Sequence, residues 1–90
     1  MNDPVSASPD PADYETTVER VGQAIAWYSE RILAERRSAA PDPDRLDQLI
    51  SRHRACLEDQ ERLEEAGPEE LARIAAAYDA LLTELESDEQ

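Results

Sequence analysis

A helical repeat of apolar residues, interrupted twice by proline, is the feature of this 90-residue sequence that most constrains its fold. From Asp13 onward, apolar side chains recur at alternating steps of four and three residues, which places them on one face of an α-helix. The members of this first stripe are Tyr14, Val18, Val21, Ile25, Tyr28 and Ile32. We therefore expect a first helix from about residue 13 to about residue 39.

The segment SAAPDPD marks the first break in the pattern. Pro41 disfavours helix at Ala40, and Asp42 followed by Pro43 is a favourable pair for an N-cap and a first helical turn. A second helix is expected over about residues 43–66. Polar residues interrupt its inward stripe, which consists of Leu46, Leu49, Ile50, His53, Cys56, Leu57, Gln60 and Leu63.

Gly67 and Pro68 mark the second break. Glycine is typical of helix ends and proline of first helical turns, and the acidic Glu69 and Glu70 suit the positive end of a helix dipole. The third helix is expected over about residues 68–86. Its stripe comprises Leu71, Ile74, Tyr78, Leu81 and Leu85, widened by Ala75 and Leu82.

These three stripes predict an all-α fold, an antiparallel three-helix bundle of up-down-up topology. The proline-rich acidic residues 1–12 are expected to be a disordered tail, and residues 87–90 to fray. At about 1.5 Å per residue, the first helix is roughly 40 Å long and the third roughly 27 Å, so part of the first lacks an intramolecular partner. That overhang favours a dimer. In an alternative topology, a second chain or another partner completes a core shared between the first helix and a hairpin of the other two.

The charge of the chain excludes several classes of partner. With 22 acidic and nine basic residues, the net charge of −13 repels a nucleic-acid backbone and an anionic lipid surface. No apolar run approaches the length of a membrane span, and the first residues do not resemble a secretion signal. With a single cysteine, no internal disulfide forms, so we expect a cytoplasmic protein. All nine basic residues are arginine, which indicates a GC-rich bacterial genome.

Trp27 is the first candidate for protein interaction. Helical spacing places it about 200° from Ile25, nearly opposite the apolar stripe, where we expect it to be at least partly exposed. An exposed tryptophan is a typical anchor of protein interfaces. Alternatively, it lies flat on its own helix with Arg31 stacked on the ring, or the tail or another helix covers it.

His53 and Cys56 share a face of the second helix and could supply two metal ligands, but the chain has no other His or Cys. A metal site within one chain is therefore not expected, although a dimer would pair the two residues. We expect instead a hydrogen-bonded interior histidine beside a small apolar thiol. Catalysis through Cys56 would need a base and a lowered pKa on a face predicted to be packed. We expect neither an enzyme nor a cofactor.

Acidic residues are concentrated in the last third of the chain. Residues 58–90 carry a net charge of −10, whereas residues 20–57 carry +2. The densest run places Glu58, Glu61, Glu64 and Glu65 near the second bend, where they form either a dock for a basic partner or a solubilising surface. Because the molecule is electrically polarised, two copies would be complementary in an antiparallel arrangement.

From these observations we expect a small interaction module, a regulatory or adaptor protein. Its partner is another protein, basic ones included, or a second copy of itself. Trp27, Arg31, Glu58, Glu61, Glu64 and Glu65 are the candidate interaction residues. Two alternatives stay open: an acidic antagonist of a nucleic-acid-binding protein, such as an antitoxin or a DNA mimic, and a structural homo-oligomer.

Overall fold

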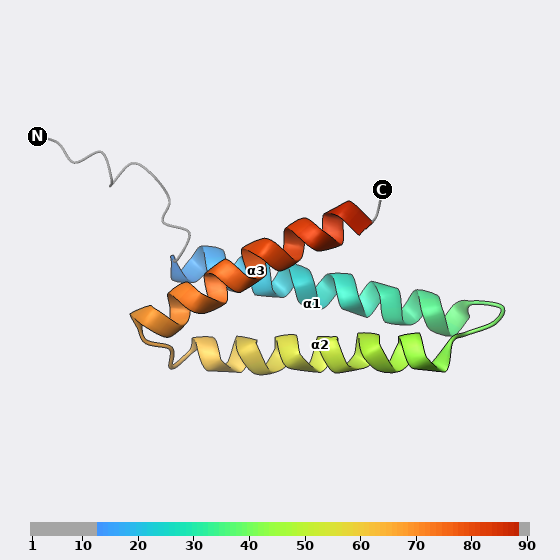
Figure 1. The fold of residues 1–90 in the computed structure, drawn as a ribbon. Helices are drawn as coiled ribbons and strands as arrows, with labels where there is room; N and C mark the ends of the chain where they lie inside the picture. Colours follow the sequence, from blue (N-terminus) through green and yellow to red (C-terminus); the bar gives the residue numbers. More distant parts are fainter. Residues whose placement is uncertain (1–12, 89–90) are drawn as a thin grey trace, which may run out of the picture.

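The computed structural model describes residues 13–88, and these fold into three helices without any strand. The helices are α1 (Tyr14–Arg37), α2 (Pro43–Leu63) and α3 (Pro68–Asp88). Figure 1 shows the chain running along α1, back along α2 and forward again along α3, which is the expected up-down-up order. Within the described part of the chain, no helix is long and apolar enough to cross a membrane. The expectations for residues 1–12 and 89–90 lie outside the described residues.

Local sequence signals set the start of α2. The Asp42 side chain accepts hydrogen bonds from the backbone N–H groups of Asp44, at 3.0 Å, and Arg45, at 3.3 Å, so it caps the helix as expected. The carboxylate of Glu35 holds the preceding loop, since it accepts from the Asp42 N–H at 2.8 Å. The end of α1 is thereby tied to the first turn of α2.

The second bend differs from the expectation. α2 ends at Leu63, several residues before Gly67, because hydrogen bonds from Glu64 to Glu61 and from Glu65 to Arg62 tighten its last turn. Gly67 has no left-handed backbone and does not stop α2; its carbonyl accepts the N–H of Leu71 and so begins α3. α1 ends two residues before the expected end, at Arg37, and α3 continues two residues beyond it, to Asp88.

The core lies along α1, which packs against both other helices, whereas α2 and α3 contact each other far less. Val21 and Ala24 of α1 are fully buried, and Thr17 joins them because its hydroxyl donates to the Asp13 carbonyl at 2.8 Å. The other buried apolar residues are Tyr28, Ile32, Leu49, Cys56, Leu63, Ile74, Ala75, Tyr78 and Leu85. Near the start of α1, a hydrogen-bonded hydroxyl group therefore takes the place of an apolar side chain in the core.

Three residues predicted to face the core are exposed. Tyr14 is 45% exposed in the first turn of α1, Leu57 of α2 is 39% exposed, and Gln60 is exposed as well. The reason is that α1 and α3 cover only part of the predicted stripe of α2. Its buried residues are Leu49, Cys56 and Leu63, a narrow line at steps of seven, and the neighbouring positions lie at the edge.

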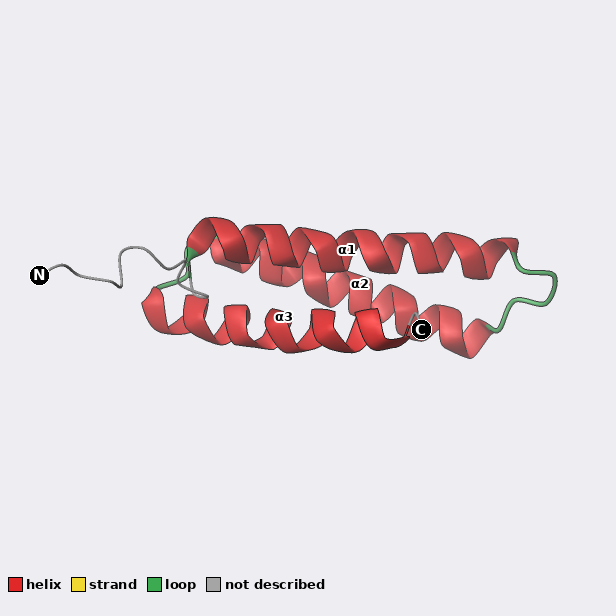
Figure 2. Ribbon diagram, turned by 90° about the horizontal axis from the view of Figure 1, so that it is seen from above, coloured by secondary structure: helices red, strands yellow, loops and turns green. Residues whose placement is uncertain are grey.

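The helices do not enclose one another evenly. α3 starts beside the end of α2, crosses α1 obliquely and finishes well away from α2, short of the loop that joins α1 to α2 (Figure 1). Figure 2 shows α3 running beside α1, with α2 passing behind the two. The divergence of α3 from α2 leaves surface depressions between them, and the other side of the α1–α2 pair is not covered by α3.

Candidate protein-interaction site

Trp27 lies half-buried against the core rather than on a bare helix face. Its ring meets that of Tyr28 edge to face, with centroids 5.2 Å apart and planes at 85°. The Arg31 guanidinium carbon stands 4.6 Å from the centroid of the indole ring, which is the stacking that one of the alternatives for Trp27 described. The face predicted to be the back of α1 is the one on which α3 packs, as the 2.6 Å ion pair between Arg20 and Asp79 shows.

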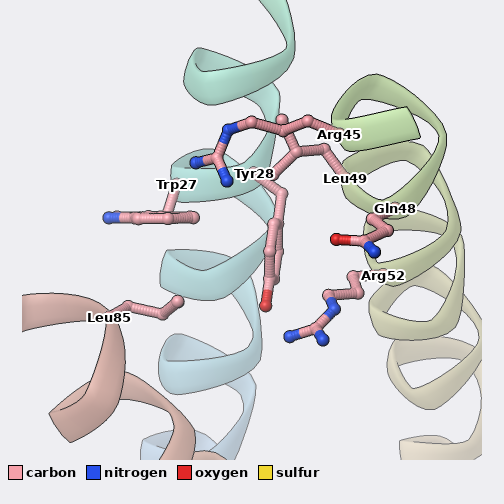
Figure 3. A pocket seen from close by; sticks show the side chains of 7 residues that line it. All are labelled: Trp27, Tyr28, Arg45, Gln48, Leu49, Arg52 and Leu85. Atoms are coloured by element: carbon pink, nitrogen blue, oxygen red, sulfur yellow. The ribbon is translucent and has the colours of Figure 1, made fainter. Parts of the chain in front are cut away.

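A pocket of about 180 Å³ opens beside Trp27, where α3 diverges from α2. Figure 3 shows Trp27 and Leu85 on one side, Gln48 and Arg52 of α2 on the other and Tyr28 between them, with the Arg45 side chain reaching across from α2 toward Trp27. The polar side chains that α2 contributes are Arg45, Gln48 and Arg52, spaced i, i+3 and i+7, which places all three on one face of α2. Leu49 completes the apolar lining.

The polar rim of this pocket is positively charged. Among residues 13–88, no carboxylate forms an ion pair with Arg52, and Arg45 has a long contact of 3.6 Å with Glu35, with its side chain 54% exposed. Guanidinium groups only donate hydrogen bonds, in a fork that matches a carboxylate. The pocket, which we call the Trp27 pocket, can therefore hold an apolar side chain together with a group that accepts hydrogen bonds.

The four predicted glutamates gather at the opposite end of α2. Glu58, Glu61, Glu64 and Glu65 line an open depression with Arg62 as the one basic residue beside them. None of the four lines the Trp27 pocket. The six candidate residues thus form two separate groups: Trp27 with Arg31 on α1, and an acidic surface at the end of α2.

His53 and Cys56 do not act together, because each faces a different helix. The Nε2 atom of His53 lies 3.0 Å from the Ser29 hydroxyl oxygen on α1, the hydrogen-bonded state expected for it. Cys56 is buried beside Tyr78 of α3. Burial raises the pKa of Cys56; a hydrogen bond with Tyr78 opposes this shift, and the charge of Asp59 reinforces it. A raised pKa keeps the thiol protonated and a poor nucleophile.

Tyr78 and Asp59 form a polar contact between α2 and α3 that the sequence pattern did not single out. The Tyr78 hydroxyl donates to Asp59 Oδ2 at 2.7 Å, and Arg62 contacts Oδ1 of the same carboxylate at 3.3 Å. Burial raises the pKa of Tyr78 above its ordinary range, and its hydrogen bonds with Asp59 and Cys56 add to the shift. The hydrogen bond between Tyr78 and Asp59 therefore has a structural role, which is to join α3 to α2.

Across residues 13–88, no group of three or more His, Cys, Asp or Glu side chains is placed to hold a metal ion. The pocket residues of α2 and Leu85 of α3 were missed as site residues. The i, i+3, i+7 spacing of Arg45, Gln48 and Arg52 was visible in the sequence, but only packing brings that face opposite Trp27. The chain matches no protein-family model, no curated protein and no solved structure.

Proposed function

We propose that this chain is a protein-binding module, a regulatory or adaptor protein of the bacterial cytoplasm that acts by holding a segment of another protein. The Trp27 pocket carries the proposal. Interface anchors are enriched in tryptophan and arginine, and in this pocket Trp27 and Arg52 line the same depression.

The chemistry of the pocket defines the segment that fits it. The half-buried Trp27 ring offers apolar surface to one aliphatic or aromatic side chain, and the buried Leu49 and Leu85, each 6% exposed, add little to it. Arg45 and Arg52 are two helical turns apart, about 10 Å along the axis, so they suit acceptor groups on either side of that side chain. A segment with a leucine or aromatic residue flanked by aspartate or glutamate meets both requirements.

The single tryptophan makes the proposal directly measurable, because its fluorescence reports on the pocket itself. We expect peptides that combine an apolar residue with two or three acidic residues to change the emission of Trp27. Peptides with lysine in place of the acidic residues should not. Arg52→Ala should weaken binding about tenfold, the loss of roughly one charge-assisted hydrogen bond.

Arg54→Ala is the matched control. Arg54 lies on α2 two residues further on and points about 200° away from Arg52, so its removal should leave peptide affinity unchanged. Failure of every acidic peptide to alter the emission, or equal affinities for wild type and Arg52→Ala, would contradict the proposal.

The acidic surface supports a second candidate function, that of an antagonist docking a basic nucleic-acid-binding protein. The clustering of Glu58, Glu61, Glu64 and Glu65 around one depression favours it. A charge reversal of Glu64 and Glu65 to lysine should then abolish a salt-sensitive association with a basic protein. It should leave the binding of acidic peptides to the Trp27 pocket intact, which separates the two functions.

A further inference from the structure

A second surface, distinct from the Trp27 pocket, lies on the side of α1 and α2 that α3 leaves uncovered. A mainly apolar groove of about 410 Å³ is lined there by Ser29, Ile32, Leu33, Arg36, Ile50 and His53, with no residue from α3. Leu33 is 49% exposed, and Leu57, one turn beyond His53 on the same face of α2, is 39% exposed. We call this surface the open face.

Gly22 extends the open face along α1, two turns before Ser29. Glycine inside a helix destabilises it relative to alanine, but it lets the backbone of another element approach closely. Within the described structure, a Cβ atom at Gly22 would meet nothing within 4 Å. No element that the structure describes therefore needs the space that this glycine leaves.

From this geometry we propose that the open face binds a second copy of the chain, antiparallel to the first, in a symmetric dimer. The two-fold axis lies in the interface and crosses the helices at the level of Ser29 and His53, which are hydrogen-bonded across α1 and α2. In that arrangement α1 packs on the second copy's α1 and α2 on its α2, each pair running in opposite directions.

The positions of the charged residues select this arrangement. Arg36 lies seven residues beyond Ser29, and Glu61 eight residues beyond His53, so they stand about 10 Å and 12 Å from the axis on opposite sides. The two-fold axis brings the second copy's Arg36 to the level of Glu61. Neither side chain has an ion-pair partner among residues 13–88. A parallel dimer would instead bring the two basic ends together, which costs free energy.

The same axis accounts for Gly22 and the exposed leucines. Gly22 lies as many residues before Ser29 as Arg36 lies after it, so the second copy's Arg36 crosses α1 where no side chain stands in its way. Leu33 comes level with the second copy's Ile25, and Leu57 with its Ile50, which covers the apolar part of both faces.

Sedimentation velocity of the full chain at concentrations from about 1 to about 500 µM tests the dimer. We expect wild type to dimerise within this range and Gly22→Leu to remain monomeric, with an unchanged or higher melting temperature when dilute, because leucine is the better helix former. Gln23→Leu, at the neighbouring exposed position, is the control that should still dimerise.

A charge swap tests the geometry without adding bulk. Arg36→Glu and Glu61→Arg should each weaken dimerisation about tenfold, since symmetry removes two ion pairs at once, and the double variant should restore it. Arg37→Glu, one residue further on α1, should have little effect. Any one of three outcomes would overturn the proposal: a wild-type chain that stays monomeric over the whole concentration range, a Gly22→Leu variant that dimerises like wild type, or a double variant that dimerises more weakly than both single variants.

Discussion

The hydrogen bond between Tyr78 and Asp59 provides the sharpest test of how α3 is held to α2. Removing only the hydroxyl, in Tyr78→Phe, keeps the ring in the core and deletes a 2.7 Å bond to a carboxylate oxygen. A hydrogen bond to a charged group stabilises a protein by about 1.5 to 3 kcal/mol. The Asp59 side chain is 27% exposed and keeps its contact with Arg62, so the lower end of that range applies.

We therefore expect Tyr78→Phe to lower the free energy of unfolding by about 1.5 kcal/mol. For a domain of this size, that corresponds to a fall of about 6 to 12 °C in the melting temperature. Circular dichroism during thermal and urea unfolding measures both quantities, in dilute protein so that self-association does not contribute.

Three further variants, Tyr14→Phe, Asp59→Asn and a double variant, show whether the Tyr78 hydroxyl itself is responsible. Tyr14→Phe makes the same chemical change at a residue that is 45% exposed, and it should alter the free energy of unfolding by less than about 0.5 kcal/mol. Asp59→Asn combined with Tyr78→Phe should cost less than the sum of the two single changes, because the residues interact directly. A Tyr78→Phe variant as stable as wild type would refute the reasoning, because the hydrogen bond to Asp59 would then contribute no net stability.

Three other predictions follow from burial, capping and titration. Leu63→Ala should lower the free energy of unfolding by about 3 kcal/mol because Leu63 is 2% exposed, whereas Leu57→Ala should lower it by under about 1 kcal/mol in dilute solution. Equal losses for the two variants in urea unfolding would contradict the burial pattern. Asp42→Ala should lower the free energy of unfolding by about 1 kcal/mol, because α2 loses its cap. Asp47 is an exposed acidic residue inside the same helix, so Asp47→Ala should leave stability almost unchanged. Thermal unfolding of each variant measures the difference. Because the pKa of the buried Cys56 is raised in the fold, the unfolded chain releases this proton first, so stability should be full below about pH 9 and fall above it. Cys56→Ala should make that fall shallower, and identical pH profiles would show that the thiol is not involved.

The periodicity of apolar residues and the proline-bearing breaks were sufficient to predict three helices. The Asp42–Pro43 pair marked the start of α2, because a cap and a fixed backbone angle are local properties of a few residues. The stacking of Arg31 on Trp27 was predictable for the same reason, since both residues lie one turn apart on one helix. Most of the expected apolar stripes of α1 and α3 are at least partly buried.

The end of α2 and the width of its buried stripe were not predictable from the pattern. Gly67 was predicted to end α2, but α2 ends before it because backbone hydrogen bonds from Glu64 and Glu65 tighten the last turn. Leu57 and Gln60 have the spacing of core residues and yet are exposed. Helical spacing defines a face, but how much of that face is buried depends on the neighbouring helices.

The sequence by itself determined the class of fold, the order and approximate limits of the helices, and the residues that could serve as anchors, because these depend on interactions within about one turn of the chain. Only the tertiary structure decided that α3 packs on the side of α1 that carries Trp27, that Arg45 and Arg52 line a pocket with Trp27, and that one side of α1 and α2 is left open. Those outcomes depend on the angle at which α3 crosses α1. That angle follows from side-chain packing between residues far apart in the sequence, which no local pattern encodes.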